Sequence, residues 1–150
     1  MTENAAARFW EAFREKSGLP EDTPYEAWAF GSDPDGLAAL VLSGDKRATA
    51  SAYPLYALEG ERLPRAGDYS VLLDGAGRPR CVLRNTDVRV VPFDRVTERH
   101  AFLEGEGDKS LTHWRSVHEA FFTHELKAAG LVFDRAMPVV CEVFEVVFVG

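Results

Sequence analysis

The last strand-like run of the chain, PVVCEVFEVVFV at residues 138–149, sets the strongest limit on the fold. It is rich in valine and phenylalanine, residue types that favour pleated, half-buried surfaces. A run this apolar is unsuited to an open sheet edge, where unpaired backbone groups invite other chains to pair. We therefore expect a closed or tightly covered sheet and, with helices elsewhere, an α+β fold around a small β-barrel.

Two earlier segments are also strand-like. They are YSVLLD at residues 69–74 and RCVLRNTDVRVVPF at residues 80–93. Gly75 and Gly77 lie between these segments, and glycines at this position are typical of a hairpin turn. We therefore expect the two segments to pair in the sheet.

The first third of the chain has the periodicity of helices instead. Apolar residues three and four positions apart share one helix face, and here they are Ala6, Phe9, Trp10 and Phe13. Gly18 is suited to end this helix. Thr23 and Gly31 suit the start and stop of a second helix, as Asp33 and Gly44 suit those of a third.

The length of the chain, 150 residues, is enough for one domain with a proper core. We expect a single domain over residues 1–150, in which residues 1–30 form a helical N-terminal extension packed on the barrel. A short helix at residues 94–103 and a longer one at residues 110–129 are expected to flank the sheet.

Composition narrows the range of partners. The net charge of −7 argues against binding along long duplex DNA, because such binding depends mainly on neutralising phosphates. No run approaches the roughly 18 apolar residues of a membrane span. The N-terminus lacks the pattern of a signal peptide. We expect a cytoplasmic protein without a membrane partner.

The cysteines and histidines predict no metal and no cofactor. Cys81 and Cys141 lie in apolar strand-like runs, which favours buried free thiols over a disulfide. His118 and His124 are six positions apart, which puts them on different faces of a helix rather than together on a metal. No Cys/His cluster has the spacing of a zinc site.

The segment GDKRATAS, residues 44–51, is the first candidate site. It brings Lys46, Arg47, Thr49 and Ser51 together in an otherwise acidic chain. One interpretation is a solvated turn that leads into a strand. The other is a small cationic site, lined by hydroxyls, for an anionic or polar ligand.

The segment EGEGDKS, residues 104–110, is the second candidate site. It leads into a helix, and the free N–H groups of a helix N-terminus can bind an anion. Lys109, Ser110 and Arg115 would then contact a phosphate. The alternative is an ordinary loop in which Ser110 caps the helix. Tyr53, Tyr56 or Trp114 would stack on a base, unless Trp114 belongs to a core stripe with Leu111, Val117 and Phe121.

These segments, taken in order with the strand at 69–74 and the terminal strand, resemble the ASCH domain of the PUA-like superfamily. The family motif G-x-K-x-x-T is present as Gly44, Lys46 and Thr49, and the resemblance covers residues 31–147. It implies a PUA-like barrel with a cleft that binds RNA or nucleotides. Some members resemble hydrolases: one branch deacylates nucleosides of the N4-acetylcytidine type, and ribonuclease activity is also ascribed to the family.

The resemblance also implies catalytic residues. The lysine, threonine and glutamate of the deacylating branch correspond to Lys46, Thr49 and Glu104. Thr49 would supply the nucleophilic hydroxyl. Lys46 would act as a base only in its neutral form, and Glu104 would steer it and move the proton. Positions three apart in a strand face opposite sides, so Lys46 and Thr49 converge only if the chain bends after Gly44. Otherwise Lys46 pairs with a carboxylate and Thr49 lies in the strand ladder.

The functional prediction is an ASCH domain that binds RNA or a nucleoside or nucleotide ligand, as a metal-independent hydrolase of RNA or an acylated nucleoside. A non-catalytic RNA-binding or interaction module is the alternative, and ribonuclease action would gain support if His100 and His113 faced the same cleft as Lys46. The oligomeric state is not predicted. The expected ligand-binding residues are Gly44, Ser51, Tyr53, Lys109, Ser110, Trp114 and Arg115.

Overall fold

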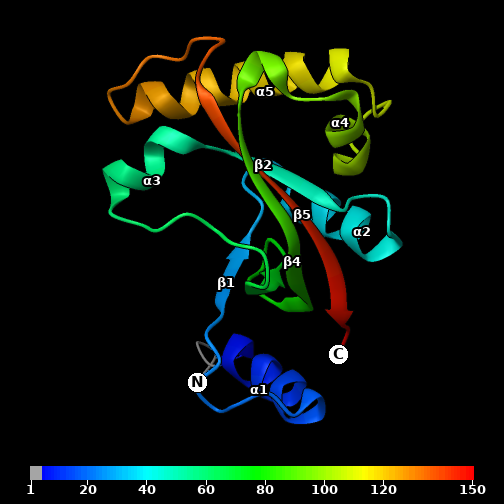
Figure 1. Ribbon diagram of the computed structural model, residues 1–150. Coiled ribbons are helices and arrows are strands. Elements are labelled where there is room, and N and C mark those ends of the chain that lie inside the picture. The colour runs from blue at the N-terminus through cyan, green and yellow to red at the C-terminus, as the bar shows by residue number, and fades with distance from the viewer. Residues whose placement is uncertain (1–4) are drawn as a thin grey trace. The chain divides into compact units, whose positions relative to one another are not determined.

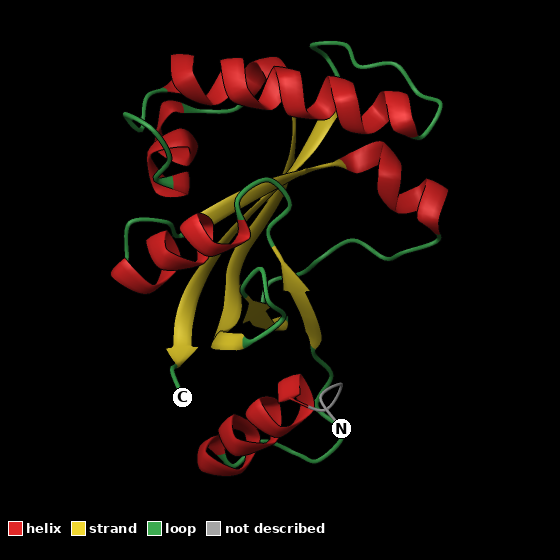
Figure 2. Ribbon diagram, turned by 180° about the vertical axis from the view of Figure 1, so that it is seen from behind, coloured by secondary structure: helices red, strands yellow, loops and turns green. Residues whose placement is uncertain are grey.

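The computed structural model describes residues 5–150. Helices and strands are interspersed along the chain (Figure 1), and Figure 2 shows them from behind, coloured by type. In chain order they are α1 Ala5–Ser17, β1 Glu26–Ala29, α2 Pro34–Ser43, β2 Ala48–Ala52, α3 Tyr53–Glu59, β3 Tyr69–Leu73, β4 Pro79–Pro92, the short 3-10 helix η2 Phe93–Arg95, α4 Glu98–Glu104, α5 Leu111–Ala128 and β5 Pro138–Phe148.

The strand order explains the apolar end of the chain. The five described strands form one sheet in the order β1-β3-β4-β5-β2, so β5 lies between two neighbours. The expectation that this run is not an open edge is confirmed. Cover by neighbouring strands is enough to account for its composition.

The chain divides into two compact units. The first contains the described residues through Lys46, with residues 66–86 and 144–150, and the second contains residues 47–65 and 87–143. In the first unit β1 pairs parallel with β3, and β3 pairs antiparallel with β4. The predicted turn is present: the N–H of Gly77 donates to the carbonyl of Asp74 at 3.0 Å.

Successive residues along the strands of the first unit point to opposite faces of the sheet, and apolar residues are buried on both faces. Val71 packs with Trp10 and Phe13 of α1, whereas the next residue, Leu72, packs with Ala38 and Val41 of α2. Successive strand residues point to opposite faces, so each helix covers its own face of the strands.

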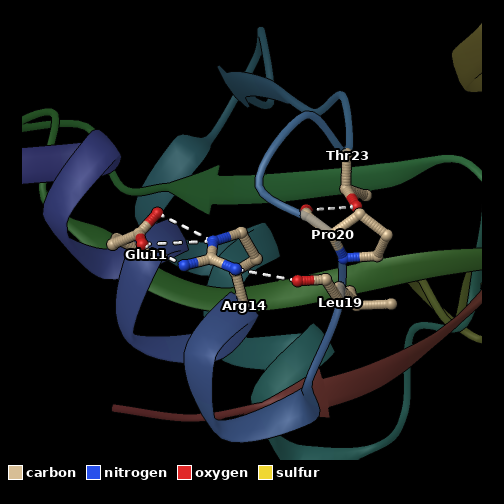
Figure 3. Close-up of polar contacts among 5 residues, drawn as sticks. All are labelled: Glu11, Arg14, Leu19, Pro20 and Thr23. Carbon is tan, nitrogen blue, oxygen red and sulfur yellow. Dashed lines mark hydrogen bonds and ion pairs between the residues drawn. The ribbon is translucent and has the colours of Figure 1, made fainter.

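Helix α1 ends where the sequence predicts, at Ser17, and Gly18 has a φ of +72°. Figure 3 shows how this end is held: Arg14 contacts the carboxylate of Glu11 and donates from Nη1 to the carbonyl of Leu19 at 2.8 Å. The hydroxyl of Thr23 donates to the carbonyl of Pro20 at 2.7 Å.

The second helix predicted between Thr23 and Gly31 is wrong. This segment contains strand β1, whose residues pair with residues 70–73 of β3. Thr23 uses its hydroxyl as a donor to the preceding turn instead of as a helix cap. Tyr25 stacks on Trp10 with ring centroids 4.7 Å apart. The pairing of β1 with β3 and the stacking of Tyr25 on Trp10 therefore outweigh the preference for a helix capped by Thr23, which is worth about 1 kcal/mol.

The third predicted helix is confirmed as α2. The Asp33 side chain accepts the N–H of Gly36 at the start, and Gly44 ends the helix with a φ of +89°. The predicted helix at residues 94–103 is divided: η2 and α4 are separated by Val96 in an extended conformation, and Thr97 caps α4. Helix α3, with Pro54 in its first turn, was not expected.

In the second unit β2 pairs antiparallel with β5, and the core gathers around Phe93, Phe122 and Leu126. Helix α5 matches the predicted range, but its buried face is rotated from the predicted stripe. Trp114 is buried, whereas Val117 is 41% exposed and Phe121 is 39% exposed. The buried side follows an i, i+4 row from Trp114 through Phe122 to Leu126.

Candidate functional site

A buried carboxylate lies at the end of α4. Thr97 caps the start of this helix by accepting the N–H of His100, and Gly105 ends it in a left-handed conformation. Glu104, the last helical residue, is only 1% exposed. A buried carboxylate is costly unless donors compensate for the water that it has lost.

Aromatic and imidazole rings surround this carboxylate. The indole N–H of Trp114 donates to Oε2 of Glu104 at 2.7 Å. Nε2 of His100, one helical turn before Glu104, lies 2.8 Å from the same oxygen. Nε2 of His118 lies 3.4 Å from the other oxygen, Oε1. We call Glu104, His100, Trp114 and His118 the Glu104 cluster.

Helix α5 positions the two rings that it contributes. Trp114 and His118 are four positions apart and therefore share one helix face. Their rings stack with centroids 4.2 Å apart and an interplanar angle of 14°. Nδ1 of His118 lies 2.9 Å from the carbonyl oxygen of Trp114, which fixes the ring further.

The Glu104 cluster lies beside strands β2 and β5. The N–H of Arg47, just before β2, donates at 2.7 Å to the carbonyl of Leu103, the residue before Glu104. In β5, burial, followed by the negative charge of Glu104, raises the pKa of the Cys141 thiol to about 12. Ala50 of β2 is the pairing partner of Cys141.

Thr49 lies in β2, opposite Glu142 of β5. It is half-buried, and its hydroxyl makes no hydrogen bond within residues 5–150. Ser51 shares its strand face by alternation and is bonded to Tyr56, with the two hydroxyl oxygens 2.7 Å apart. Thr49 and Ser51 therefore lie in a strand, as the sequence predicts for the residues that follow the turn.

Lys46 is not a solvated turn residue. It belongs to the first unit and is 1% exposed, with Nζ 5.2 Å from the centroid of the Phe30 ring. The N–H groups of Asp45 and Lys46 both donate at 3.0 Å to the carbonyl of Leu40. The chain thus bends after Gly44. Arg47 is exposed.

The loop that follows Glu104 is held by its own contacts. Ser110 caps α5 by accepting the N–H of His113 at 3.0 Å, and Asp108 accepts the N–H of Ser110 at 2.9 Å. Lys109 has a φ of +66°, and its Nζ lies 5.3 Å from the centroid of the Phe102 ring. The predicted N-cap role of Ser110 is confirmed.

Arg115 and Tyr53 are not members of the Glu104 cluster. Arg115 donates from Nη2 to the carbonyl of Asp94 at 3.0 Å and lines a groove of about 920 Å³. Tyr53, at the start of α3, is 38% exposed. The groove is lined by Glu98, Leu111, Thr112, Arg115, Ser116, Glu119, Ala120, Thr123, His124, Lys127 and Arg135, and none of these residues belongs to the cluster.

Comparison with known proteins identifies the family. A family model for the ASCH domain matches residues 26–148. The chain belongs to the ASCH domain family. The crystal structure of the ASCH domain from Lactobacillus crispatus JV V101 is 33% identical, with a TM-score of 0.88, over 97% of this chain and 95% of that one. Protein EF3133 from Enterococcus faecalis V583 is 37% identical, with a TM-score of 0.88, over 99% of this chain and 91% of that one.

More distant matches add only the fold. Hypothetical protein PH0355 is 17% identical, with a TM-score of 0.55, over 82% of this chain and 98% of that one. No curated protein matches the chain significantly. The predicted ASCH fold, an α+β arrangement of helices and a PUA-like sheet, is confirmed by the two closely superposing structures.

Within residues 5–150 of this ASCH domain, no three His, Cys, Asp or Glu side chains are arranged to hold a metal ion. None of the helices in the same range combines the length and the apolar composition needed to cross a membrane.

Sequence reasoning missed two members of the Glu104 cluster in this ASCH domain. The sequence singles out His100 only beside His113, and it offers His118 only as a metal ligand that helical spacing excludes. His100 precedes Glu104 by four residues, and His118 follows Trp114 by four. Residues at this spacing face the same way on a helix, so the i, i+4 rule was the available signal.

Proposed function

We propose that this ASCH domain binds RNA or a nucleoside-type ligand and hydrolyses it without a metal ion. Lys46, Thr49 and Glu104 are the proposed reacting residues. The observation that carries the proposal is the Glu104 carboxylate, buried to 1% exposure and bonded to indole and imidazole nitrogens.

Stability alone does not account for such a cluster. Removing a carboxylate from water costs several kcal/mol, and well-packed apolar side chains of similar volume are often as stabilising. Buried ionisable groups that are surrounded by fixed donors are instead typical of sites that move protons. The buried Glu104 therefore supports a chemical role.

Thr49 supplies the hydroxyl for the nucleophile: the residue is half-buried, and no hydrogen bond within the described residues engages its hydroxyl. The contact between Arg47 and Leu103 brings the start of its strand to the residue beside Glu104. The family resemblance assigns to Lys46 the activation of this hydroxyl.

The proposed reaction has two stages. The Thr49 oxygen adds to the acyl carbon of an amide such as that of N4-acetylcytidine, and its proton passes to a base. The carbon–nitrogen bond then breaks, and the leaving amine takes a proton. Water finally cleaves the ester formed on Thr49, which returns the hydroxyl and releases the acid.

The test is turnover of N4-acetylcytidine and of a short single-stranded RNA, in the presence of a chelator. We expect one of the two to be hydrolysed by the wild type, and the rate to fall at least about 100-fold in Lys46→Ala. Lys16→Ala is the control, because Lys16 contacts Phe148 at the protein surface and belongs to no candidate site. Equal rates in Lys46→Ala and the wild type would reject the proposal.

A non-catalytic RNA-binding module is the second candidate, and the groove along α5 favours it. Arg115, Lys127 and Arg135 line this groove with hydroxyl-bearing residues, which suits a phosphate backbone, although Glu119 pairs with Arg135 at 2.9 Å. In that case Lys127→Ala weakens RNA binding, and no variant or wild type shows turnover.

A further inference from the structure

The groove along α5 contains an arginine that no carboxylate of the described residues neutralises. Arg115 is half-buried, and its guanidinium makes one hydrogen bond within residues 5–150, from Nη2 to the carbonyl oxygen of Asp94 at 3.0 Å. The chain has 24 Asp and Glu residues against 17 Lys and Arg. Acidic partners are therefore plentiful, and the positive charge of Arg115 is available to a ligand.

The contact with Asp94 holds this guanidinium in place. Nε of Arg115 is shielded from solvent and has no hydrogen-bond partner within the described residues. A freely solvated arginine would turn this N–H toward water, because a buried donor without a partner is costly. The side chain is thus fixed beside the groove, and a charge that is fixed in advance loses little entropy when a ligand binds.

A second cation without a partner lies at the other end of the groove. Lys127, in the last turn of α5, is exposed, and its side chain makes no hydrogen bond or ion pair within residues 5–150. It follows Arg115 by three turns of the helix and a fraction, which corresponds to about 18 Å along the helix axis. The helix therefore sets the separation of two uncompensated positive charges.

The stretch between these two cations is lined by small side chains. They are those of Ser116, Ala120 and Thr123, and the groove has a volume of about 920 Å³. The two hydroxyl groups can donate to or accept from the backbone of a ligand. Glu119 pairs with Arg135 at 2.9 Å, so these two charges already compensate each other. The groove thus has room for a chain-like ligand whose charges lie toward its ends.

The composition of the groove favours a polypeptide over RNA as that ligand. Grooves for single-stranded RNA combine basic residues with aromatic side chains on which bases stack. No Phe, Tyr or Trp is among the described residues that line this groove. Glu98 and Glu119 do line it, and they would repel a backbone that carries a negative charge at every residue. A peptide can carry carboxylates only where the cations lie.

We propose that the groove along α5 is a docking site for an extended acidic segment of a partner protein, with one carboxylate on Arg115 and another on Lys127. An extended chain rises about 3.3 Å per residue, so acidic residues five or six positions apart span the two cations. The inference is independent of the proposed hydrolysis, because the groove shares no residue with the Glu104 cluster. It assigns to the groove a ligand other than the RNA of the second candidate function.

The first experiment compares three labelled probes by fluorescence anisotropy at low salt: decaglutamate, decaglutamine and an oligouridylate of the same length. We expect decaglutamate to bind most tightly. The net charge of −7 repels an acidic peptide, so its binding requires a local positive site. Tighter binding of the oligouridylate would overturn the inference in favour of an RNA site, and binding of none of the probes would overturn it as well.

Two variants locate the binding site. We expect Arg115→Gln and Lys127→Gln each to raise the Kd of decaglutamate about fivefold. Arg99→Gln is the matched control, because Arg99 is exposed on α4 and does not line the groove. Lys127 is exposed and makes no contact that holds the fold, so its variant decides the result if Arg115→Gln unfolds. An equal loss in Arg99→Gln would overturn the proposed site.

A spacing series tests the two-cation arrangement. The probes are serine- and glycine-based peptides of constant length that carry two glutamates at increasing separation. We expect the tightest binding at a separation of five or six positions, and no preferred separation in Lys127→Gln. A Kd that does not depend on the separation in the wild type would contradict the proposal. None of these measurements requires turnover, so failure of the proposed hydrolysis leaves their outcome unaffected.

Discussion

The indole N–H of Trp114 donates to Oε2 of Glu104 at 2.7 Å, across two different helices. Trp114 is 3% exposed and also belongs to the hydrophobic core of the second unit. The same side chain therefore packs in the core and replaces part of the hydration that the buried carboxylate of Glu104 has lost. The expected base-stacking role of Trp114 has no support in this arrangement, because its ring already stacks on His118.

Replacing Trp114 with phenylalanine separates these two roles. Trp114→Phe keeps an aromatic ring but removes the donor to Glu104. Hydrogen bonds to charged groups contribute about 1.5–3 kcal/mol, so we expect a loss of that size in the free energy of unfolding, measured in urea.

Trp10→Phe is the matched control for this prediction. Trp10 is 4% exposed and stacks on Tyr25, and its indole nitrogen makes no hydrogen bond within the described residues. An equal or larger loss for Trp10→Phe would show that packing alone accounts for the effect.

Both the backbone conformation of Gly107 and the nearby ring of His113 disfavour a side chain at this position. Its φ is +59°, and a β-carbon at this position would lie 2.3 Å from Nε2 of His113. Gly77, with a φ of +78°, has open space around it. We expect Gly77→Ala to lose about 1–2 kcal/mol of stability and Gly107→Ala to lose somewhat more, because the imidazole of His113 must turn aside.

The double variant Gly107→Ala with His113→Ala checks the cause. Removing the imidazole relieves the steric overlap, so the alanine at position 107 should cost less in this background than in the wild type. If its cost is the same in both backgrounds, the contact between Gly107 and His113 is unimportant.

Asp74 makes the stability of the first unit sensitive to acid. The N–H of Arg78, with further hydrogen bonds from Ala76 and the Arg78 side chain, holds the pKa of Asp74 below its ordinary value. The stabilisation is complete above the ordinary pKa of an aspartate and is lost as the pH falls through the lowered value.

Urea unfolding at pH 7, 5 and 3 tests this prediction. Asp74→Asn should lower stability at pH 7 and flatten its decline toward pH 3. Asp87→Asn is the control, because Asp87 is an exposed partner of Arg89 at 2.9 Å. Parallel pH profiles for Asp74→Asn and the wild type would contradict this account.

The two thiols should be unreactive in the folded protein. Both are buried, and burial raises the pKa of Cys81 to about 11 and contributes most to the pKa of about 12 at Cys141. At pH 8 we expect very slow labelling by a disulfide reagent, and rapid labelling of both thiols in urea. Rapid labelling of the folded protein would contradict the described burial.

Cap residues in the sequence predicted the ends of helices correctly where no long-range pairing competed with them. Asp33 and Gly44 delimit α2 as predicted, and Ser110 caps α5. The segment after Thr23 has similar cap residues, but it forms β1 because it pairs with β3, an interaction that no local pattern reveals. The buried face of α5 was likewise misplaced, since an exposed Phe121 and a buried Phe122 are equally apolar in sequence.

The candidate site was predictable only in part, and for a similar reason. The family resemblance pointed to Glu104, and helical spacing could have added His100. Trp114 and His118 reach Glu104 from a different helix after an intervening loop. Their distances depend on how α4 and α5 pack, so the sequence alone could not show that four side chains form one cluster.

The most direct test of a functional Glu104 cluster is the hydrolysis rate of Glu104→Gln, measured beside its urea unfolding. Glutamine has nearly the same shape and can still accept the Trp114 N–H, so we expect the variant to remain folded. Its turnover of the substrate should fall about 100-fold or more, because the amide cannot carry the proton. A folded Glu104→Gln protein with the rate of the wild type would contradict the account.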